Sequence, residues 1–410
     1  MKKALIILGR YFPKASPNAV CMQNIIDKMI NDGYQIQVVS YCDECQYTGS
    51  IPVKRISRGL IQSCIYRLEN KNTAFAKVVL KGLVTLKKVK DGMCFAIWPL
   101  TDPIFTIKTY YICRNLHKNQ KYDYVICVHM PLSSLVVGYM LKKKDPNIKY
   151  IPYFLDSLSG GRPQRIFSEK WNLKKKLQWE KKLLPLADKI VVMESSKEHH
   201  EKYSKKMEYY NKFVYLDIPL LCKGTSSAIQ NPYDPNYYNV TFCGTAIRPI
   251  RNMDFFSNIA KAVKTKEKLI RFYIIGDCNC QSILEDDNVF VLQKMGHDSL
   301  IPYLQNADAL INFGVKTPSA ISGKIFEYMA YGKPIISTYS IPNEACIPYL
   351  RRYPESLLID EKNEEIDTLA NSIVQFVLKT RNRSISIDEI YTQFSNNLPE
   401  AFINKVLANE

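Results

Sequence analysis

The sequence predicts an α/β protein with two doubly wound domains that face each other across a cleft. Short apolar segments rich in β-branched residues alternate with helical segments along most of the chain, as expected where helices join buried parallel strands. The alternation stops at residues 231–236, where turn-forming residues cluster, and resumes at residue 240. At 410 residues the chain is long enough for each domain to bury its own core.

The expected strands are residues 4–8, 35–40, 124–128, 149–155 and 189–193 in the first half and 240–244, 271–275, 288–292, 309–313 and 334–337 in the second. Residues 42–103 fit this alternation poorly and are compatible with a long helical insertion. We expect the first domain at residues 1–217, a linker at 218–238 and the second domain at 239–385. Residues 386–410 are predicted to form a helix that returns to the first domain.

The composition excludes several classes of protein. A hydrophobic content of 46% with only 16 glycines excludes disordered and fibrous chains. The 12 cysteines have no regular spacing, so we interpret them as thiols in a reducing compartment and expect no zinc site. No apolar run approaches the roughly 20 residues that cross a bilayer. We therefore expect a cytoplasmic protein whose membrane contact, if it has any, is peripheral.

A net charge of +17 favours polyanionic partners such as nucleic acid, anionic lipid or diphosphate groups. No nucleic-acid-binding motif accompanies the charge, so nucleic acid is not an expected partner. Residues 171–184 form a lysine-rich amphipathic helix with Leu173, Leu177 and Leu184 on one face. Such a pattern fits a helix on an anionic membrane surface, and it also fits a helix packed on the sheet with a solvated lysine face.

Residues 322–336 are the most informative segment. Ser322, Gly323 and Lys324 are typical of a helix start, and Gly332 of a helix end before a new strand. Unpaired N–H groups and the helix dipole make a helix start suitable for an anion, and Lys324 adds a charge. Glu327, one turn further on, would reach a hydroxyl-bearing group attached to that anion. The segment predicts a nucleotide-sugar site, with an ordinary capped helix as the alternative.

This segment resembles the donor-binding motif of retaining glycosyltransferases of the GT-B fold and the family-4 type. Their motif has two glutamates separated by seven residues, the second followed by small residues and Gly-x-Pro. Glu327, Gly332 and Pro334 match the second half, whereas the first glutamate position is occupied by Ser319. The Ser-Gly-Lys form is similar to transferases that build bacterial surface polysaccharides. The resemblance is specific from about residue 240 to 336 and weaker in the first half.

The resemblance implies a donor-binding second domain and an acceptor-binding first domain. The donor would be a nucleoside-diphosphate-sugar, with UDP the expected nucleotide, and the acceptor a glycan or a lipid-linked saccharide. Gly244, followed by Arg248 and Arg251, matches the family's glycine and basic groups for the diphosphate. The alternative for the arginines is a solvated basic loop. Gly276 would line the nucleotide side, and the backbone around Met295 would contact the base.

The sequence predicts no metal and no other cofactor. Metal-dependent sugar transferases usually hold their cation with Asp-x-Asp, which this chain lacks. Residues 285–287 are acidic but precede a strand, and so lie at the wrong edge of the sheet. We expect arginine, lysine and a helix dipole to stabilise the leaving diphosphate in place of the cation.

Candidate catalytic residues of the first domain follow its strands. The resemblance implies a catalytic-site histidine near the reacting sugar, and His129 ends the strand at 124–128; a structural histidine is the alternative. Asp156 ends the next strand and is a rival catalytic or acceptor-binding group. Asn18 and Ala19 lie in the loop where the family often carries a glycine pair that lets the backbone approach donor and acceptor, and the resemblance implies that they are small substitutes on the donor side.

Two other functions remain open from the sequence. A GT-B nucleotide-sugar 2-epimerase would turn over its donor without an acceptor. A non-catalytic nucleotide- or sugar-binding protein is suggested only by Ser319 at the expected glutamate, and hydrolysis of the donor would exclude it.

Overall fold

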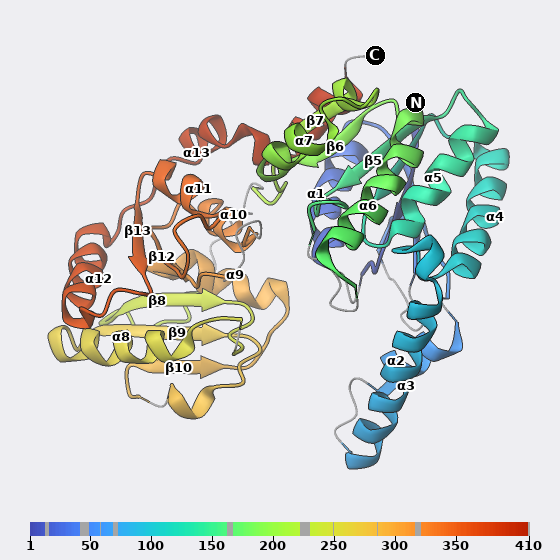
Figure 1. Ribbon diagram of the computed structural model, residues 1–410. Coiled ribbons are helices and arrows are strands. Elements are labelled where there is room, and N and C mark those ends of the chain that lie inside the picture. The colour runs from blue at the N-terminus through green and yellow to red at the C-terminus, as the bar shows by residue number, and fades with distance from the viewer. Residues whose placement is uncertain are drawn as a thin grey trace. The chain divides into compact units, whose positions relative to one another are not determined.

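The computed structural model describes residues 1–12, 16–41, 49–57, 59–68, 73–161, 167–221, 230–248, 250–284, 286–315 and 321–408. The chain divides into two compact units, each built on one parallel sheet (Figure 1). The first unit is Met1–Pro219 with Pro399–Glu410, and the second is Leu220–Leu398.

The first unit has a seven-stranded parallel sheet in the order β3-β2-β1-β4-β5-β6-β7. Its strands are β1 (Lys3–Leu8), β2 (Gln35–Ser40), β3 (Val53–Arg55), β4 (Tyr124–Val128), β5 (Lys149–Phe154), β6 (Ile190–Met193) and β7 (Phe213–Leu216). Its helices are α1 (Pro17–Asn31), α2 (Leu60–Leu68), α3 (Ala74–Met93), α4 (Pro103–Gln120), α5 (Leu132–Lys144), α6 (Glu169–Leu183), α7 (Lys197–Ser204) and α14 (Pro399–Phe402). The strand order reverses between β1 and β4, and ligands bind at the carboxyl edge of such a switch point.

Strand β1 shows why this sheet is covered on both faces. Side chains alternate between faces along a strand. Ala4 and Ile6 pack in one core with α1 and the C-terminal segment, and Leu5 and Ile7 pack in a second core with α4 and α5. All of these side chains are buried, which is why the strand is apolar at consecutive positions.

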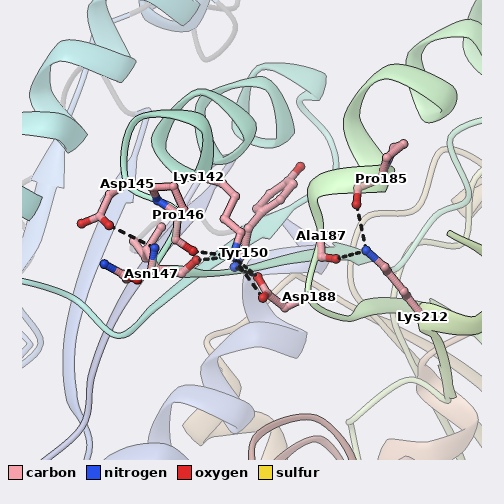
Figure 2. Close-up of polar contacts among 10 residues, drawn as sticks. Lys142, Asp145, Pro146, Asn147, Tyr150, Pro185, Ala187, Asp188 and Lys212 are labelled. Carbon is pink, nitrogen blue, oxygen red and sulfur yellow. Dashed lines mark hydrogen bonds and ion pairs between the residues drawn. The ribbon is translucent and has the colours of Figure 1, made fainter. Parts of the chain in front are cut away.

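Several lysines of the first unit are used inside the fold. Lys142 donates to the carbonyls of Pro146 and Ile148 and pairs with Asp188, at 2.9–3.0 Å (Figure 2). Lys212 donates to the carbonyls of Pro185 and Ala187 at 2.8 and 2.9 Å (Figure 2). These bonds tie together the segments that lead into β5, β6 and β7. Part of the basic excess therefore stabilises the sheet and does not face a partner.

The second unit has a six-stranded parallel sheet in the order β10-β9-β8-β11-β12-β13. Its strands are β8 (Tyr238–Cys243), β9 (Ile270–Ile275), β10 (Val289–Leu292), β11 (Ala309–Asn312), β12 (Ile335–Tyr339) and β13 (Ser356–Asp360). Its helices are α8 (Met253–Lys266), α9 (His297–Asn306), α10 (Lys324–Met329), α11 (Ile347–Arg352), α12 (Ile366–Thr380) and α13 (Ile387–Gln393). This is the strand order of a Rossmann fold, with the switch point between β8 and β11.

The predicted fold class of two Rossmann-like domains is confirmed. The helices in the poorly patterned region are α2 and α3, although β3 also lies there. The chain's last part differs from the predicted single helix: α13 groups with the second unit, and only Pro399–Glu410 groups with the first. Within the described ranges, no helix has both the length and the hydropathy needed to cross a bilayer.

Candidate functional site

In the first unit, the three predicted residues Asn18, His129 and Asp156 come together at the carboxyl edge of the sheet. Ser16 caps α1 by accepting a hydrogen bond from the N–H of Ala19 at 3.3 Å, which places Asn18 in the first turn. Asn18 Nδ2 donates to the His129 carbonyl at 3.2 Å. His129 Nδ1 lies 2.8 Å from the Asp156 carbonyl. One small network thus spans the loops after β4 and β5 and the start of α1.

The contacts of His129 determine its protonation state. A carbonyl oxygen only accepts, so Nδ1 must carry the proton that bonds Asp156. Burial lowers the pKa of His129 to about 4, opposed by that bond and helped by the Lys176 charge. At neutral pH the ring is therefore neutral and its Nε2 is a hydrogen-bond acceptor. This state suits it to accept from a sugar hydroxyl and not to act as a cationic acid.

Asp156 differs from His129 in its exposure. Its side chain reaches solvent. The surrounding protein raises the pKa of its carboxyl, and a hydrogen bond from the Asn18 side chain opposes that rise. An ionisable, accessible carboxyl beside a buried neutral histidine is suited to receive a polar acceptor group.

Helix α6 presents a polar stripe to the interior, which the sequence did not indicate. Asn172, Lys176 and Glu180 are buried at successive turns. Glu180 accepts from the N–H of Ser159 at 3.0 Å, and Lys176 donates to the Gly161 carbonyl at 3.0 Å. Burial raises the pKa of Glu180 to about 7. The stripe holds the loop that follows Asp156, and the prediction that Lys176 belongs to a solvated lysine face is wrong.

In the second unit, Gly244 and Gly276 directly follow β8 and β9 and lie in contact. The N–H of Gly244 donates to the Ile275 carbonyl at 2.9 Å. A Cβ built on Gly276, whose φ is +141°, would lie 2.1 Å from the Gly244 carbonyl oxygen. Only glycine fits this crossing of two backbones. Met295 lies half-buried in the loop after β10, at the same edge.

The two predicted arginines have different surroundings. Arg248 is exposed, and its guanidinium pairs with Asp254. Arg251 is half-buried, and its Nη1 donates to the carbonyl of Phe313, directly after β11. It thus lies at the switch point between β8 and β11. Its buried Nε has no hydrogen-bond partner among the described residues, an unsatisfied donor that an anion would complete.

Glu344 is a site residue that the sequence analysis missed. It is 2% exposed, and its Oε1 accepts from the N–H of Val315 at 3.2 Å. Burial raises its pKa to about 7, and the nearby charge of Arg251 lowers it. Glu344 therefore connects the loop after β11 to the loop after β12, close to Arg251. An acid soon after a predicted strand was the only signal for it in the sequence.

The segment at 322–336 differs in detail from its prediction. Helix α10 begins at Lys324, its N-cap is Gly323 without a side-chain bond, and it ends at Met329. Ser322 is therefore not the N-cap; its N–H donates to Cys346 Sγ at 3.2 Å. Lys324 Nζ and Glu327 Oε2 form an ion pair at 2.8 Å. Ser319 lies outside the described residues.

The sequence predicts that acidic residues 285–287 lie at the wrong edge of the sheet to hold a metal, and the described ones do lie at that edge. Asp286 and Asp287 precede β10, at the amino edge of the sheet, and both pair with Lys264. Glu285 lies outside the described residues.

The second unit matches a known family. Residues 238–378 match the model of the family described as glycosyl transferases group 1. The match runs from β8 into α12 and includes the described donor-site residues of the second unit. The chain is a glycosyltransferase. No curated protein sequence matches it significantly.

Three solved structures show that the whole chain has the GT-B fold. A sucrose-phosphate synthase from Thermosynechococcus elongatus is 13% identical with a TM-score of 0.64, covering 100% of this chain and 99% of that chain. TarM from S. aureus, in complex with fondaparinux, α-GlcNAc-glycerol and UDP, is 10% identical with a TM-score of 0.58 and 100% coverage of both chains. WaaG, a glycosyltransferase involved in lipopolysaccharide biosynthesis, is 12% identical with a TM-score of 0.56, covering 98% and 100%.

Proposed function

We propose that this glycosyltransferase moves a hexosyl or N-acetylhexosaminyl group, with retention, from a UDP-linked sugar to a lipid-linked or polysaccharide acceptor. The observation that carries the proposal is Arg251, held at the β8/β11 switch point of the family domain with an unsatisfied guanidinium donor. UDP in the TarM structure and the lipopolysaccharide role of WaaG support the donor and the acceptor class. The enzyme would work in the cytoplasm, peripherally on the inner face of the cytoplasmic membrane, which its charge of +17 favours.

In this proposal the second unit stabilises the leaving diphosphate. Retaining transfer requires charge to be neutralised at the leaving group while the acceptor hydroxyl attacks the same face of the sugar. The guanidinium of Arg251 is preorganised by the Phe313 carbonyl and partly desolvated, so its interaction with a diphosphate is stronger than in water. Glycines at positions 244 and 276 let the backbone approach the nucleotide closely.

The Lys324–Glu327 ion pair would separate when the donor binds. Both side chains are partly accessible, at 33% and 20%. Lys324, at the start of α10, would turn to a phosphate oxygen, and Glu327 would accept hydrogen bonds from ribose hydroxyls. The pair keeps both side chains near the site before binding.

In the first unit, His129 and Asp156 would act on the sugars. The neutral His129 would accept from a hydroxyl of the transferred sugar through Nε2, which orients it. Asp156 would bind the acceptor hydroxyl from the exposed side of the same network. Asn18 would keep the two loops together and is a positioning residue.

Glu327→Ala should weaken UDP binding roughly tenfold to a hundredfold. A hydrogen bond to a charged group is worth about 1.5–3 kcal/mol, and the variant loses the proposed bonds to ribose. Calorimetric titration of the full chain with UDP, GDP and ADP measures this and tests the choice of base. Glu364→Ala, an exposed glutamate of the same unit, is the matched control and should bind like wild type. Unchanged affinity in Glu327→Ala would remove the proposed role.

Transferase activity should survive EDTA. The sequence has no Asp-x-Asp, and Arg251 and Lys324 are proposed to supply the positive charge at the diphosphate. Initial rates in EDTA, compared with rates in added magnesium or manganese, measure the effect. Loss of activity in EDTA that either metal restores would show that a cation carries this charge.

A further inference from the structure

Helix α3 exposes an apolar stripe along its whole length. The stripe, which we call the α3 stripe, consists of Phe75, Val78, Leu86, Val89 and Met93, with exposed fractions of 79%, 68%, 59%, 58% and 77%. Spacings of three and four residues, with Gly82 in the gap, place these side chains on one helical face. From Phe75 to Met93 the stripe is about 27 Å long at 1.5 Å per residue.

The opposite face of α3 is already packed. Ala76 is buried, and Leu80 and Val84 are half-buried on the side away from the stripe. Helices α2 and α3 lie side by side and extend away from the sheet of the first unit (Figure 1). The α3 stripe is thus a second apolar face that nothing in the described part of the first unit covers. Monomeric proteins rarely expose such a contiguous face without an interaction partner.

Lysines border the α3 stripe. Lys81 and Lys90 lie nearest its two edges, and Lys77 and Lys88 lie further round the helix on the side of Lys81; all four are exposed. Lys90 Nζ pairs with Asp102 Oδ1 at 2.5 Å, which fixes the end of α3 to the start of α4. The helix contains one acidic residue, Asp91, and five lysines. An apolar stripe between basic flanks is complementary to an anionic lipid surface.

Helix α4, which follows α3 in the chain, has a shorter stripe of exposed apolar side chains. Ile104, Ile107 and Tyr111 are 82%, 52% and 56% exposed, and their spacing of three and four places them on one face. Phe95, in the turn between the helices, is 60% exposed. Exposed apolar side chains thus recur from Phe75 to Tyr111 and are concentrated in this region.

We propose that α3 lies in the interface of an anionic membrane, with the α3 stripe among the acyl chains and the lysines at the headgroups. Five lysines in 20 residues favour lying in the interface over crossing it. A second copy of the chain is a poorer occupant, because two lysine-flanked stripes would repel each other. The α3 stripe would be the surface through which the proposed peripheral attachment occurs, and this role does not depend on sugar transfer.

Helix α6, for which the sequence left a membrane surface and packing on the sheet both open, is a weaker candidate. Among its residues, all of which the structure describes, no large apolar side chain is exposed. Lys175 and Lys182 lie over the rings of Trp171 and Trp179, at 5.6 and 5.0 Å. Its basic groups therefore have no accompanying apolar surface for a bilayer.

Sedimentation of the full chain with vesicles tests the assignment. Wild type should bind phosphatidylcholine vesicles only when they also contain phosphatidylglycerol. Raising the salt concentration should release the protein, because exposed charges are already screened over about 8 Å at physiological ionic strength. Combining Val78→Gln, Leu86→Gln and Val89→Gln, which keep helix propensity, should lower partitioning at least about tenfold. Lys77→Gln, Lys81→Gln and Lys88→Gln together should lower it by up to about a hundredfold.

Two controls separate the α3 stripe from other surfaces. Ile30→Gln with Leu378→Gln, which changes exposed apolar residues on other helices, should bind like wild type. A second control variant, on α6, should also bind vesicles like wild type; it combines Lys174→Gln, Lys181→Gln and Lys182→Gln. All variants should bind UDP as tightly as wild type does. Measuring UDP affinity beside vesicle binding therefore distinguishes a failure of the membrane proposal from a failure of the proposed donor site. Failure of wild type to bind, equal binding by the α3 variants, or a dimer in light scattering that only the α3 variants lose would overturn the proposal.

Discussion

Arg251→Ala is expected to lower turnover by about a hundredfold to a thousandfold, whereas Arg248→Ala should lower it far less. A preorganised donor to developing negative charge is worth about 3–4 kcal/mol when removed. Arg251 is fixed by the Phe313 carbonyl at the switch point, while Arg248 is exposed and paired with Asp254. The sequence indicated both arginines together, and the structure ranks them. Replacing both should lower turnover by several orders of magnitude if both contact the diphosphate.

The measurement is the steady-state rate at saturating donor and acceptor. Arg251→Lys is the conservative control, and it should recover part of the rate because it keeps the charge but not the planar donor geometry. Loss of Arg251 also removes the positive charge beside the buried Glu344, whose pKa is already about 7. Thermal unfolding of each variant therefore accompanies the kinetics. Equal rates for Arg251→Ala and Arg248→Ala in folded proteins would show that neither arginine is preferred at the diphosphate.

The sheets were predictable because buried parallel strands are apolar at nearly every position. Strands such as Tyr124–Val128 and Ile270–Ile275 therefore stand out from the helical segments around them. Strand β3 was missed because it has three residues and its middle one is Lys54. In a strand this short, periodicity cannot be distinguished from loop sequence.

The candidate site was predictable where it depends on strand ends. Residues that follow parallel strands meet at one edge of the sheet, so His129 and Asp156 could be placed near each other before their contacts were known. Glu344 could not be placed, because its role depends on the N–H of Val315, which lies 29 residues away in sequence. Lys176 was placed on the solvated face of α6, since helical periodicity assigns lysines to solvent, whereas its side chain is buried.

Gly276→Ala is expected to destabilise the second unit by at least about 3 kcal/mol, through steric overlap and a disfavoured backbone conformation. The new Cβ would lie 2.1 Å from the Gly244 carbonyl oxygen, a backbone atom that cannot move away as a side chain could. Separating the two loops would also disturb the N–H of Gly244, which donates to the Ile275 carbonyl. The backbone that is proposed to contact the nucleotide would then be misplaced, so UDP affinity should fall with stability.

Gly296→Ala is a matched control, because Gly296 lies in the loop after β10 and its added Cβ would meet no atom within 4 Å. Its φ of −64° is also open to alanine. Hydrogen exchange of β8 and β9 measures the difference locally, which matters because a chain of two units need not unfold in one step. Gly276→Ala should exchange these strands much faster than wild type, and Gly296→Ala should not. Wild-type protection in Gly276→Ala would mean that the two loops can separate without cost, and that their contact does not define the nucleotide side of the site.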